Sequence, residues 1–129
     1  MNKVSIEFSK GDILDTKASR DIFNTVGFDV IVSNPPYVRH LEKSEMRPNV
    51  LDYEPHLALF VKDNDPLVYY RNIVNFAQKR LKPEGMLFLE INHYLGTETL
   101  GLFSSETFEK VELLKDLSGN DRFVMAKRK

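Results

Sequence analysis

Cysteine is absent from this chain of 129 residues. The chain can therefore form neither a disulfide framework nor a thiolate zinc site, and this fits a reducing compartment. Long hydrophobic runs are also missing, since no run approaches the roughly 20 residues that a membrane-spanning helix needs. The N-terminal residues have the pattern of a strand and not of a signal peptide. Together these features predict a soluble, cytoplasmic protein with no membrane partner.

An excess of positive charge is missing too, since 18 Lys and Arg face 19 Asp and Glu and the net charge is −1. The chain therefore lacks the strongly basic surface that is typical of nucleic-acid binding. The three histidines, His40, His56 and His93, have no ligand-like spacing, and we assign them no metal or general-base role. The chain is 42% hydrophobic and 29% charged, which suits one globular domain over residues 1–129.

The most informative motif is Asn34-Pro35-Pro36-Tyr37, which we call the corner. It follows the apolar run 28–33, which has the composition of a buried parallel strand. Ligands of open α/β sheets bind at the carboxyl ends of such strands. Because each proline fixes φ near −65° and lacks an N–H, the corner is stiff. The motif predicts a ligand-facing bend, and the alternative is a proline turn that only ends a strand.

The corner has the groups needed to hold a planar –NH2 group. The side-chain oxygen of Asn34 and the carbonyl of Pro35 are two acceptors that can take both amine hydrogens. This arrangement orients the nitrogen lone pair toward an electrophile without a strong base. Tyr37 adds a flat face on which an amide or a base can stack. These residues, including Pro36, are therefore our candidate catalytic residues for methylation of a nitrogen.

The remaining pattern alternates strands with helices and predicts an α/β fold. We expect strands at 4–8, 28–33, 86–91, 111–116 and 122–126, and helices within 16–25, 66–81 and 97–108. Asp65 is the expected cap of the second helix and Pro66 its first residue. The helical spacing of its apolar residues predicts one buried face, made of Leu67, Tyr70, Ile73, Val74, Ala77 and Leu81. Residues 38–60 have no sustained period, and we expect a long loop with helical pieces such as 41–46. The last two strands are expected to be antiparallel, and 127–129 a solvated tail.

Other short motifs accompany the corner. They are Gly11-Asp12, Tyr53-Glu54-Pro55 with Ala58-Leu59, the run 81–85, Leu89-Glu90-Ile91 and the run 116–122, which contains Gly-Asn-Asp-Arg. In this order they resemble the C-terminal part of the HemK/PrmC family, the peptide-chain release factor glutamine methyltransferases, over essentially the whole chain. Many amino-methylating enzymes share Asn-Pro-Pro-Tyr. Tyr-Glu-Pro before Ala-Leu and the Gly-Asn-Asp-Arg ending narrow the resemblance to this family.

The resemblance implies a partial Rossmann-like fold of the S-adenosylmethionine-dependent methyltransferases. Its sheet would be mostly parallel, with an antiparallel C-terminal strand. The implied reaction is methylation of the side-chain amide of a glutamine in release factors, with no metal. The implied cofactor contacts are Asp12, Ile13 and Asn34. The implied substrate contacts are Asn34, Pro35, Pro36, Tyr37, Tyr53, Glu54 and Pro55.

The chain departs from the family pattern at its beginning. The family's catalytic domain starts with a strand and a glycine-rich turn, followed by a second strand that ends in an acidic ribose ligand. Here the six glycines, at 11, 27, 85, 96, 101 and 119, are not near neighbours, and the first two strands and the N-terminal helical domain are missing. We therefore expect part of a longer enzyme, truncated naturally or deliberately. Cofactor binding should be weak or absent, and the isolated chain should be inactive.

Two other functions stay open at this point. The same corner can hold adenine or guanine, so a nucleic-acid amino-methyltransferase is an alternative, although the nearly neutral charge disfavours it. The second alternative is a non-catalytic piece that only binds a partner or self-associates. Unpaired strand edges recruit other chains. We therefore expect the strand 4–8 to pair within this chain or to swap into a second copy and form a homodimer.

Overall fold

The computed structural model describes residues 3–15, 17, 27–53, 55 and 59–129. Its strands are β1 (Phe28–Ser33), β2 (Val38–Arg39), β3 (Phe60–Val61), β4 (Leu81–Glu90), β5 (Phe108–Lys115) and β6 (Asp121–Arg128). Its α-helices are α2 (Pro48–Tyr53), α4 (Val68–Arg80) and α5 (Gly96–Leu100), and its 3-10 helices are η1 (His40–Glu45) and η2 (His93–Leu95). No helix of these described residues is long and apolar enough to cross a membrane.

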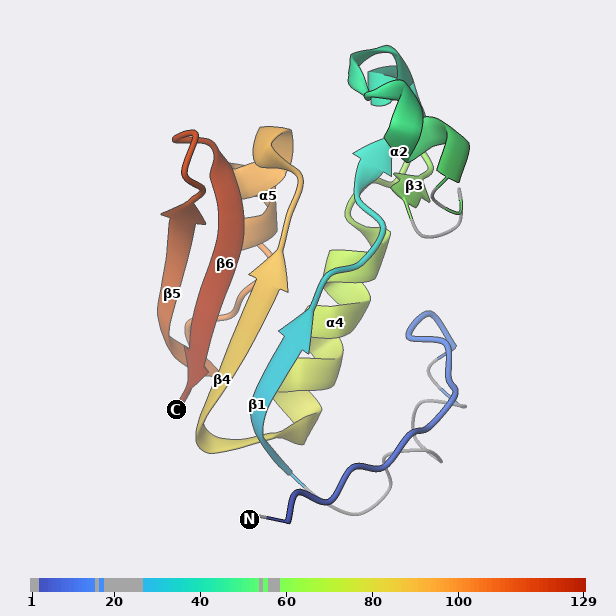
Figure 1. Cartoon of the computed structure of the whole chain (residues 1–129). Coiled ribbons are helices and arrows are strands. Elements are labelled where there is room, and N and C mark those ends of the chain that lie inside the picture. The colour runs from blue at the N-terminus through green and yellow to red at the C-terminus, as the bar shows by residue number, and fades with distance from the viewer. Residues whose placement is uncertain (1–2, 16, 18–26, 54, 56–58) are drawn as a thin grey trace.

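The main sheet has the strand order β1-β4-β6-β5 (Figure 1). β1 is parallel to β4, whereas β6 is antiparallel to both of its neighbours. It follows that β1, β4 and β5 share one direction and that only the C-terminal strand is reversed. The predicted α/β class, with its mostly parallel sheet and antiparallel last strand, is confirmed. β2 and β3 form a separate two-stranded pair.

Helix α4 covers one face of the sheet and carries the apolar stripe expected from the sequence. Its buried residues are spaced i, i+3, i+4 and i+7, which places them on one side of a helix. They are Tyr70, Ile73, Val74 and Ala77. From the sheet, alternate side chains point into the same core, as the period of a strand requires. They are Leu87 and Leu89 of β4 and Val124 and Ala126 of β6.

The start of α4 differs from the prediction. The helix begins at Val68, and Leu67 occupies the capping position without a side-chain cap bond. Asp65 lies in the preceding turn and accepts two hydrogen bonds from the Arg71 guanidinium, at 2.9 and 3.2 Å. The predicted cap at Asp65 is therefore wrong, because an ion pair engages this carboxylate and the helix starts later.

The C-terminal half also holds more strand than predicted. Helix α5 ends at Leu100, and β5 begins at Phe108. The expected solvated tail is wrong at two of its three positions, since β6 continues to Arg128. Lys127 forms ion pairs with Glu84 and Glu109, and Arg128 donates to the carbonyl of Leu81. Lys127 pairs with strands on both sides, and Arg128 pairs with Phe108 of β5, which keeps both basic residues in the sheet.

Residues 4–8 form no strand, which corrects a further expectation. Val4, Ile6 and Phe8 are 79%, 70% and 91% exposed, and the segment runs apart from the sheet in Figure 1. Alternating side chains do not make a strand without a hydrogen-bonding neighbour. The helical turns expected within 16–25 lie outside the described residues, apart from Lys17. The expected loop over 38–60 does contain a helical piece at η1, and α2 is an additional one.

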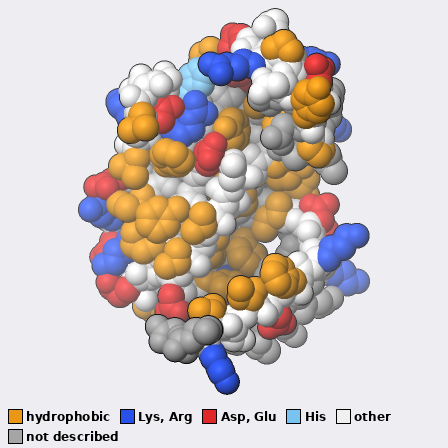
Figure 2. All heavy atoms as spheres, in the orientation of Figure 1, with side chains coloured by type: hydrophobic (Ala, Val, Ile, Leu, Met, Phe, Trp, Pro, Cys, Tyr) orange, Lys and Arg blue, Asp and Glu red, His pale blue; other side chains and the backbone are white. Residues whose placement is uncertain are grey.

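The sheet face opposite α4 exposes apolar side chains over several strands. Val32 stands beside Phe88 in the β1–β4 register, and they are 75% and 38% exposed. Val30 and Phe123 extend the same face and are also exposed. Figure 2 shows hydrophobic side chains gathered over the sheet in this view. We call this surface the open face.

Candidate functional site

The corner leaves the sheet directly at the carboxyl end of β1. Ser33, the last residue of β1, stands opposite Leu89 of the central strand β4. Asn34 is exposed, Pro35 is buried, and Pro36 and Tyr37 are half-buried. The exposed side-chain amide of Asn34 is therefore followed by the buried Pro35. Both residues lie at the sheet edge where ligands of α/β proteins bind.

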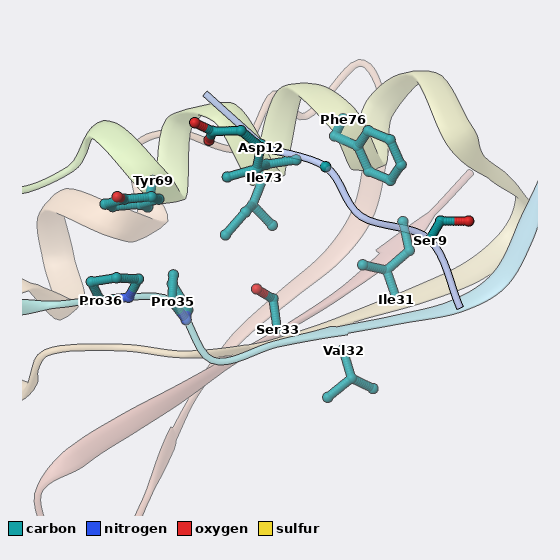
Figure 3. Close-up of a pocket in the computed structure, with 12 residues that line it drawn as sticks. Ser9, Asp12, Ile31, Val32, Ser33, Pro35, Pro36, Tyr69, Ile73 and Phe76 are labelled. Carbon is teal, nitrogen blue, oxygen red and sulfur yellow. The ribbon is translucent and has the colours of Figure 1, made fainter. Parts of the chain in front are cut away.

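A cavity of about 350 Å³ lies beside the corner (Figure 3). Ser33, Pro35 and Pro36 line one side of it. Tyr69 and Phe76 of α4 line the other side. The N-terminal segment contributes Asp12 and Ile13. Two predicted cofactor residues and two predicted substrate residues therefore meet at one cavity, although more than 20 residues separate them in the sequence.

Asp12 is held in a tight turn at the rim of this cavity. Its Oδ1 accepts the Leu14 N–H at 2.9 Å, and its carbonyl accepts the Asp15 N–H at 3.0 Å. Figure 3 shows the Asp12 carboxylate on the α4 side, across from the prolines. A carboxylate in this place can accept hydrogen bonds from the hydroxyls of a ligand.

Tyr37 is anchored away from the cavity, at the ends of other strands. Its hydroxyl donates to Glu90 Oε1 at 2.7 Å and accepts from Arg122 Nη1 at 3.4 Å. Arg122 also donates through Nε to Asp116 Oδ2 at 3.2 Å. Burial, and then the hydrogen bond to Glu90, raises the pKa of Tyr37 to about 12. The phenol is therefore neutral at physiological pH and fixes the end of the corner to β4.

This pKa predicts a loss of stability at high pH. The folded state favours the neutral phenol of Tyr37. Its contribution to the free energy of unfolding is therefore complete below the ordinary tyrosine pKa of about 10. It disappears as the pH rises through the folded pKa of about 12. Urea unfolding at pH 9 and pH 12 should therefore show a larger loss for the parent than for Tyr37→Phe. Tyr53→Phe, at a site that is 85% exposed, should behave as the parent. Equal losses in all three proteins would contradict the assignment.

Two buried polar residues that sequence reasoning missed hold the other end of Tyr37. Asn92 Nδ2 donates to the Tyr37 carbonyl at 2.9 Å and to Glu42 Oε2 at 2.8 Å. Asn92 is 2% exposed and Glu42 is 6% exposed. Burial opposes ionisation of Glu42, but hydrogen bonds from Arg39 and Asn92 outweigh it and hold its pKa below the ordinary value. The sequence signal for Asn92 was a polar residue directly after an apolar strand.

Comparisons with known proteins identify the family of this chain. The sequence family described as Eco57I restriction-modification methylase matches residues 2–113. The chain belongs to this methylase family. It is 50% identical over 124 residues to the release factor glutamine methyltransferase of Flavobacterium psychrophilum. The aligned region covers 96% of this chain and 42% of that protein. It is 44% identical over 114 residues to the enzyme of the same name from Bacteroides thetaiotaomicron, which covers 84% and 41%.

A solved structure shows the same fold. It is the release factor-specific protein-(glutamine-N5) methyltransferase from Alicyclobacillus acidocaldarius, with a TM-score of 0.52 and 26% identity, covering 90% of this chain and 55% of that one. The resemblance to the HemK/PrmC family is therefore confirmed. This methylase chain spans less than half the length of the two curated relatives named above.

The two described residues of the predicted substrate segment at 53–55 do not line the cavity of the methylase chain. Tyr53 is 85% exposed and Pro55 is exposed, and neither lines it. Glu54 lies outside the described residues. Their role in substrate binding stays a prediction. Among the described residues there is no group of three or more His, Cys, Asp and Glu that could hold a metal ion, and His40 stacks on Phe60 with ring centroids 5.0 Å apart.

Proposed function

We propose that this methylase chain supplies the substrate-binding part of an S-adenosylmethionine-dependent enzyme. That enzyme methylates the glutamine amide of peptide chain release factors. One observation carries the proposal. Pro35 and Pro36 of the corner line the same cavity as Asp12 and Ile13, whereas Asn34 and Tyr37 do not line it. The proposed amide-binding bend therefore lies beside the proposed cofactor contacts, with the Asn34 side chain next to the cavity and not in its wall. The names of the relatives supply the substrate class.

The chemistry follows from the weakness of an amide nitrogen as a nucleophile. The exposed Asn34 side chain and the Pro35 carbonyl take the two N–H groups of the glutamine amide. Both oxygens favour the positive charge that develops on the nitrogen during transfer. Because the prolines fix the backbone, these acceptors need little reorganisation. When bound, S-adenosylmethionine would supply the electrophilic methyl group and leave as the neutral thioether, and the nitrogen would lose one N–H proton to solvent beside the exposed Asn34. The protein therefore contributes mainly position and electrostatics.

The cavity fits the adenosine end of that cofactor. Its volume is about 350 Å³, and Ile13, Ile73 and Phe76 give it apolar walls suited to a flat base. The Asp12 carboxylate at the rim suits a ribose hydroxyl. The chain contains no closely spaced glycines that would cradle the methionine end. The chain alone should therefore bind S-adenosylmethionine about tenfold or more weakly than a complete enzyme, as calorimetry can measure. Equal affinities would contradict the proposed division of the site.

A chimaera provides the activity test. This chain replaces the matching 124-residue region of the Flavobacterium psychrophilum relative, and the product is incubated with methyl-labelled cofactor. Label in added release factor supports the proposal. Label in added nucleic acid supports the alternative, which the name of the matching family favours and the net charge of −1 opposes. No label in either would mean that the chain is a non-catalytic binding or self-associating piece.

Two further proposals concern partners and place. The open face and the outer edge of β1, which has no partner strand among the described residues, form a surface through which two copies associate. Light scattering over a dilution series should show a dimer that dissociates, and a monomer at every concentration would contradict this.

We also propose a cytoplasmic location, because release factors act in translation, which takes place there.

A further inference from the structure

Two segments that follow neighbouring strands are fastened together beside the corner. One is η1, which follows β1 and the corner, and the other is η2, which follows β4. Asn92 Nδ2, at the start of the second segment, donates to the Glu42 carboxylate in the first. Tyr94 donates to Glu45 Oε2 at 3.1 Å, and the Arg39 guanidinium lies 5.5 Å from the centre of the Tyr94 ring. These contacts dock η1 against the end of β4.

Within this junction the orientation of the Asn92 amide is fully determined. Its Oδ1 accepts the Tyr94 N–H at 2.9 Å, and its own backbone N–H donates to the Tyr70 hydroxyl at 2.8 Å. A flipped amide would direct Nδ2 at a backbone donor and Oδ1 at the carboxylate of Glu42. Both contacts would be repulsive, so only one orientation satisfies the buried groups. In that orientation Nδ2 donates to the Tyr37 carbonyl.

We infer that Asn92 is a positioning residue, which sets the direction of the Tyr37 carbonyl and thereby the angle at which the corner presents Asn34 and Pro35. The Tyr37 hydroxyl is held by Glu90, so both ends of this residue are fixed. The inference rests on the proposed function, because it gives the corner its role as the grip for an amide.

Glu42 gives the junction its strength. Its carboxylate also accepts the Arg39 N–H at 2.8 Å and Arg39 Nε at 3.0 Å. Hydrogen bonds to an ionised group are shorter and stronger than neutral ones. If this cluster had only a structural role, it would only dock η1 against the end of β4. A positioning role requires in addition the single bond from Asn92 to the Tyr37 carbonyl.

A residue swap separates these two roles. In Asn92→Asp, the new carboxylate faces the Glu42 carboxylate and the Tyr37 carbonyl, so both contacts are lost. In the double variant Asn92→Asp with Glu42→Gln, an amide again faces a carboxylate, so docking of η1 is restored. The Tyr37 carbonyl still lacks its donor from position 92. Glu42→Gln alone keeps that donor and serves as the matched control.

The kinetic experiment uses the chimaera and reports kcat and KM with the unfolding midpoint. We expect Asn92→Asp to lower kcat about a hundredfold, the loss that a small misplacement of reacting groups can cause. Glu42→Gln should change kcat less than about threefold. The double variant should recover the unfolding midpoint of Glu42→Gln alone but keep a kcat reduced about tenfold or more, with an unchanged KM for the cofactor. Recovery of kcat together with stability would overturn the inference, as would an unchanged kcat in Asn92→Asp.

A second measurement decides the inference even if the chimaera transfers no methyl group, an outcome that counts against the proposed function alone. The ¹³C shift of the Tyr37 carbonyl is measured by NMR on the 129-residue chain, because this carbonyl accepts the bond from Asn92. The exchange rate of the Met46 N–H, which donates to Lys43, reports on η1. In the double variant the Tyr37 carbonyl shift should move upfield relative to Glu42→Gln alone, while Met46 exchanges at the rate of Glu42→Gln. An unchanged Tyr37 carbonyl shift would overturn the inference.

Discussion

Asn34→Ala is expected to lower methyl transfer by the chimaera about 10²–10³-fold, the usual cost of removing one preorganised hydrogen-bonding group from a transition state. The substitution removes one of the two acceptors for the glutamine amide and leaves the Pro35 carbonyl in place. Since Asn34 is exposed, its replacement should leave the unfolding midpoint unchanged. Single-turnover labelling of release factor, with urea unfolding on the same samples, measures both effects.

Asn75→Ala is the matched control for this prediction. Asn75 lies on the exposed side of α4, away from the cavity residues, and its replacement removes the same amide group. It should keep the parent rate. A parent-like rate for Asn34→Ala would remove Asn34 from substrate binding and leave the prolines without the acceptor that the mechanism requires.

Leu89→Ala is expected to destabilise the chain by about 2–5 kcal/mol, as is usual for truncation of a fully buried leucine. Leu89 is 0% exposed. It stands opposite Ser33 of β1 and Val124 of β6, so its side chain lies where the corner leaves the sheet. The cavity left behind would loosen the base of the corner as well as the core. Urea unfolding of the parent and the variant measures the difference.

Leu117→Ala provides the comparison at a solvent-exposed leucine. Leu117 is 109% exposed in the turn between β5 and β6, so its truncation should change stability by no more than about 0.5 kcal/mol. Similar effects of the two substitutions would show that the core does not close over β4 as described.

Local patterns predicted the parts of the fold whose causes are local. The spacing of Tyr70, Ile73, Val74 and Ala77 predicted the buried side of α4, because helical geometry alone places them on one face. The apolar run before Asn34 predicted that the corner follows a strand of the main sheet. The alternation of strands with helices along the chain predicted the α/β class. The short turn before Arg122 predicted that the last two strands are antiparallel.

The errors occurred where tertiary partners override local preference. Asp65 has the composition of a cap, but an ion pair with Arg71 holds it in the preceding turn. Val4 to Phe8 alternates as a strand does, but none of the described strands pairs with it. Lys127 and Arg128 have the composition of a tail, but partners on two other strands hold them in the sheet. Arg71 lies only six residues from Asp65, but the ion-pair partners of Lys127 lie far away in the sequence, so a local window does not reveal them.

The candidate site was predicted only in part for the same reason. The corner residues and Asp12 and Ile13 carry motif signals, and the structure brings Pro35 and Pro36 to the cavity of Asp12 and Ile13. The junction of Asn92 and Glu42 has no motif, because 50 residues separate the two side chains. Glu90 belongs to the motif Leu89-Glu90-Ile91, but only the fold shows that its carboxylate accepts a hydrogen bond from the Tyr37 hydroxyl.

The central claim is that the proline-fixed corner directs two oxygen acceptors at one incoming –NH2 group. The most direct test is a crystal structure of the chimaera with the demethylated cofactor and a glutamine-containing release factor peptide. The glutamine nitrogen should lie about 2.7–3.2 Å from both Asn34 Oδ1 and the Pro35 carbonyl oxygen. A glutamine amide bound elsewhere, with water on both acceptors, would contradict the claim.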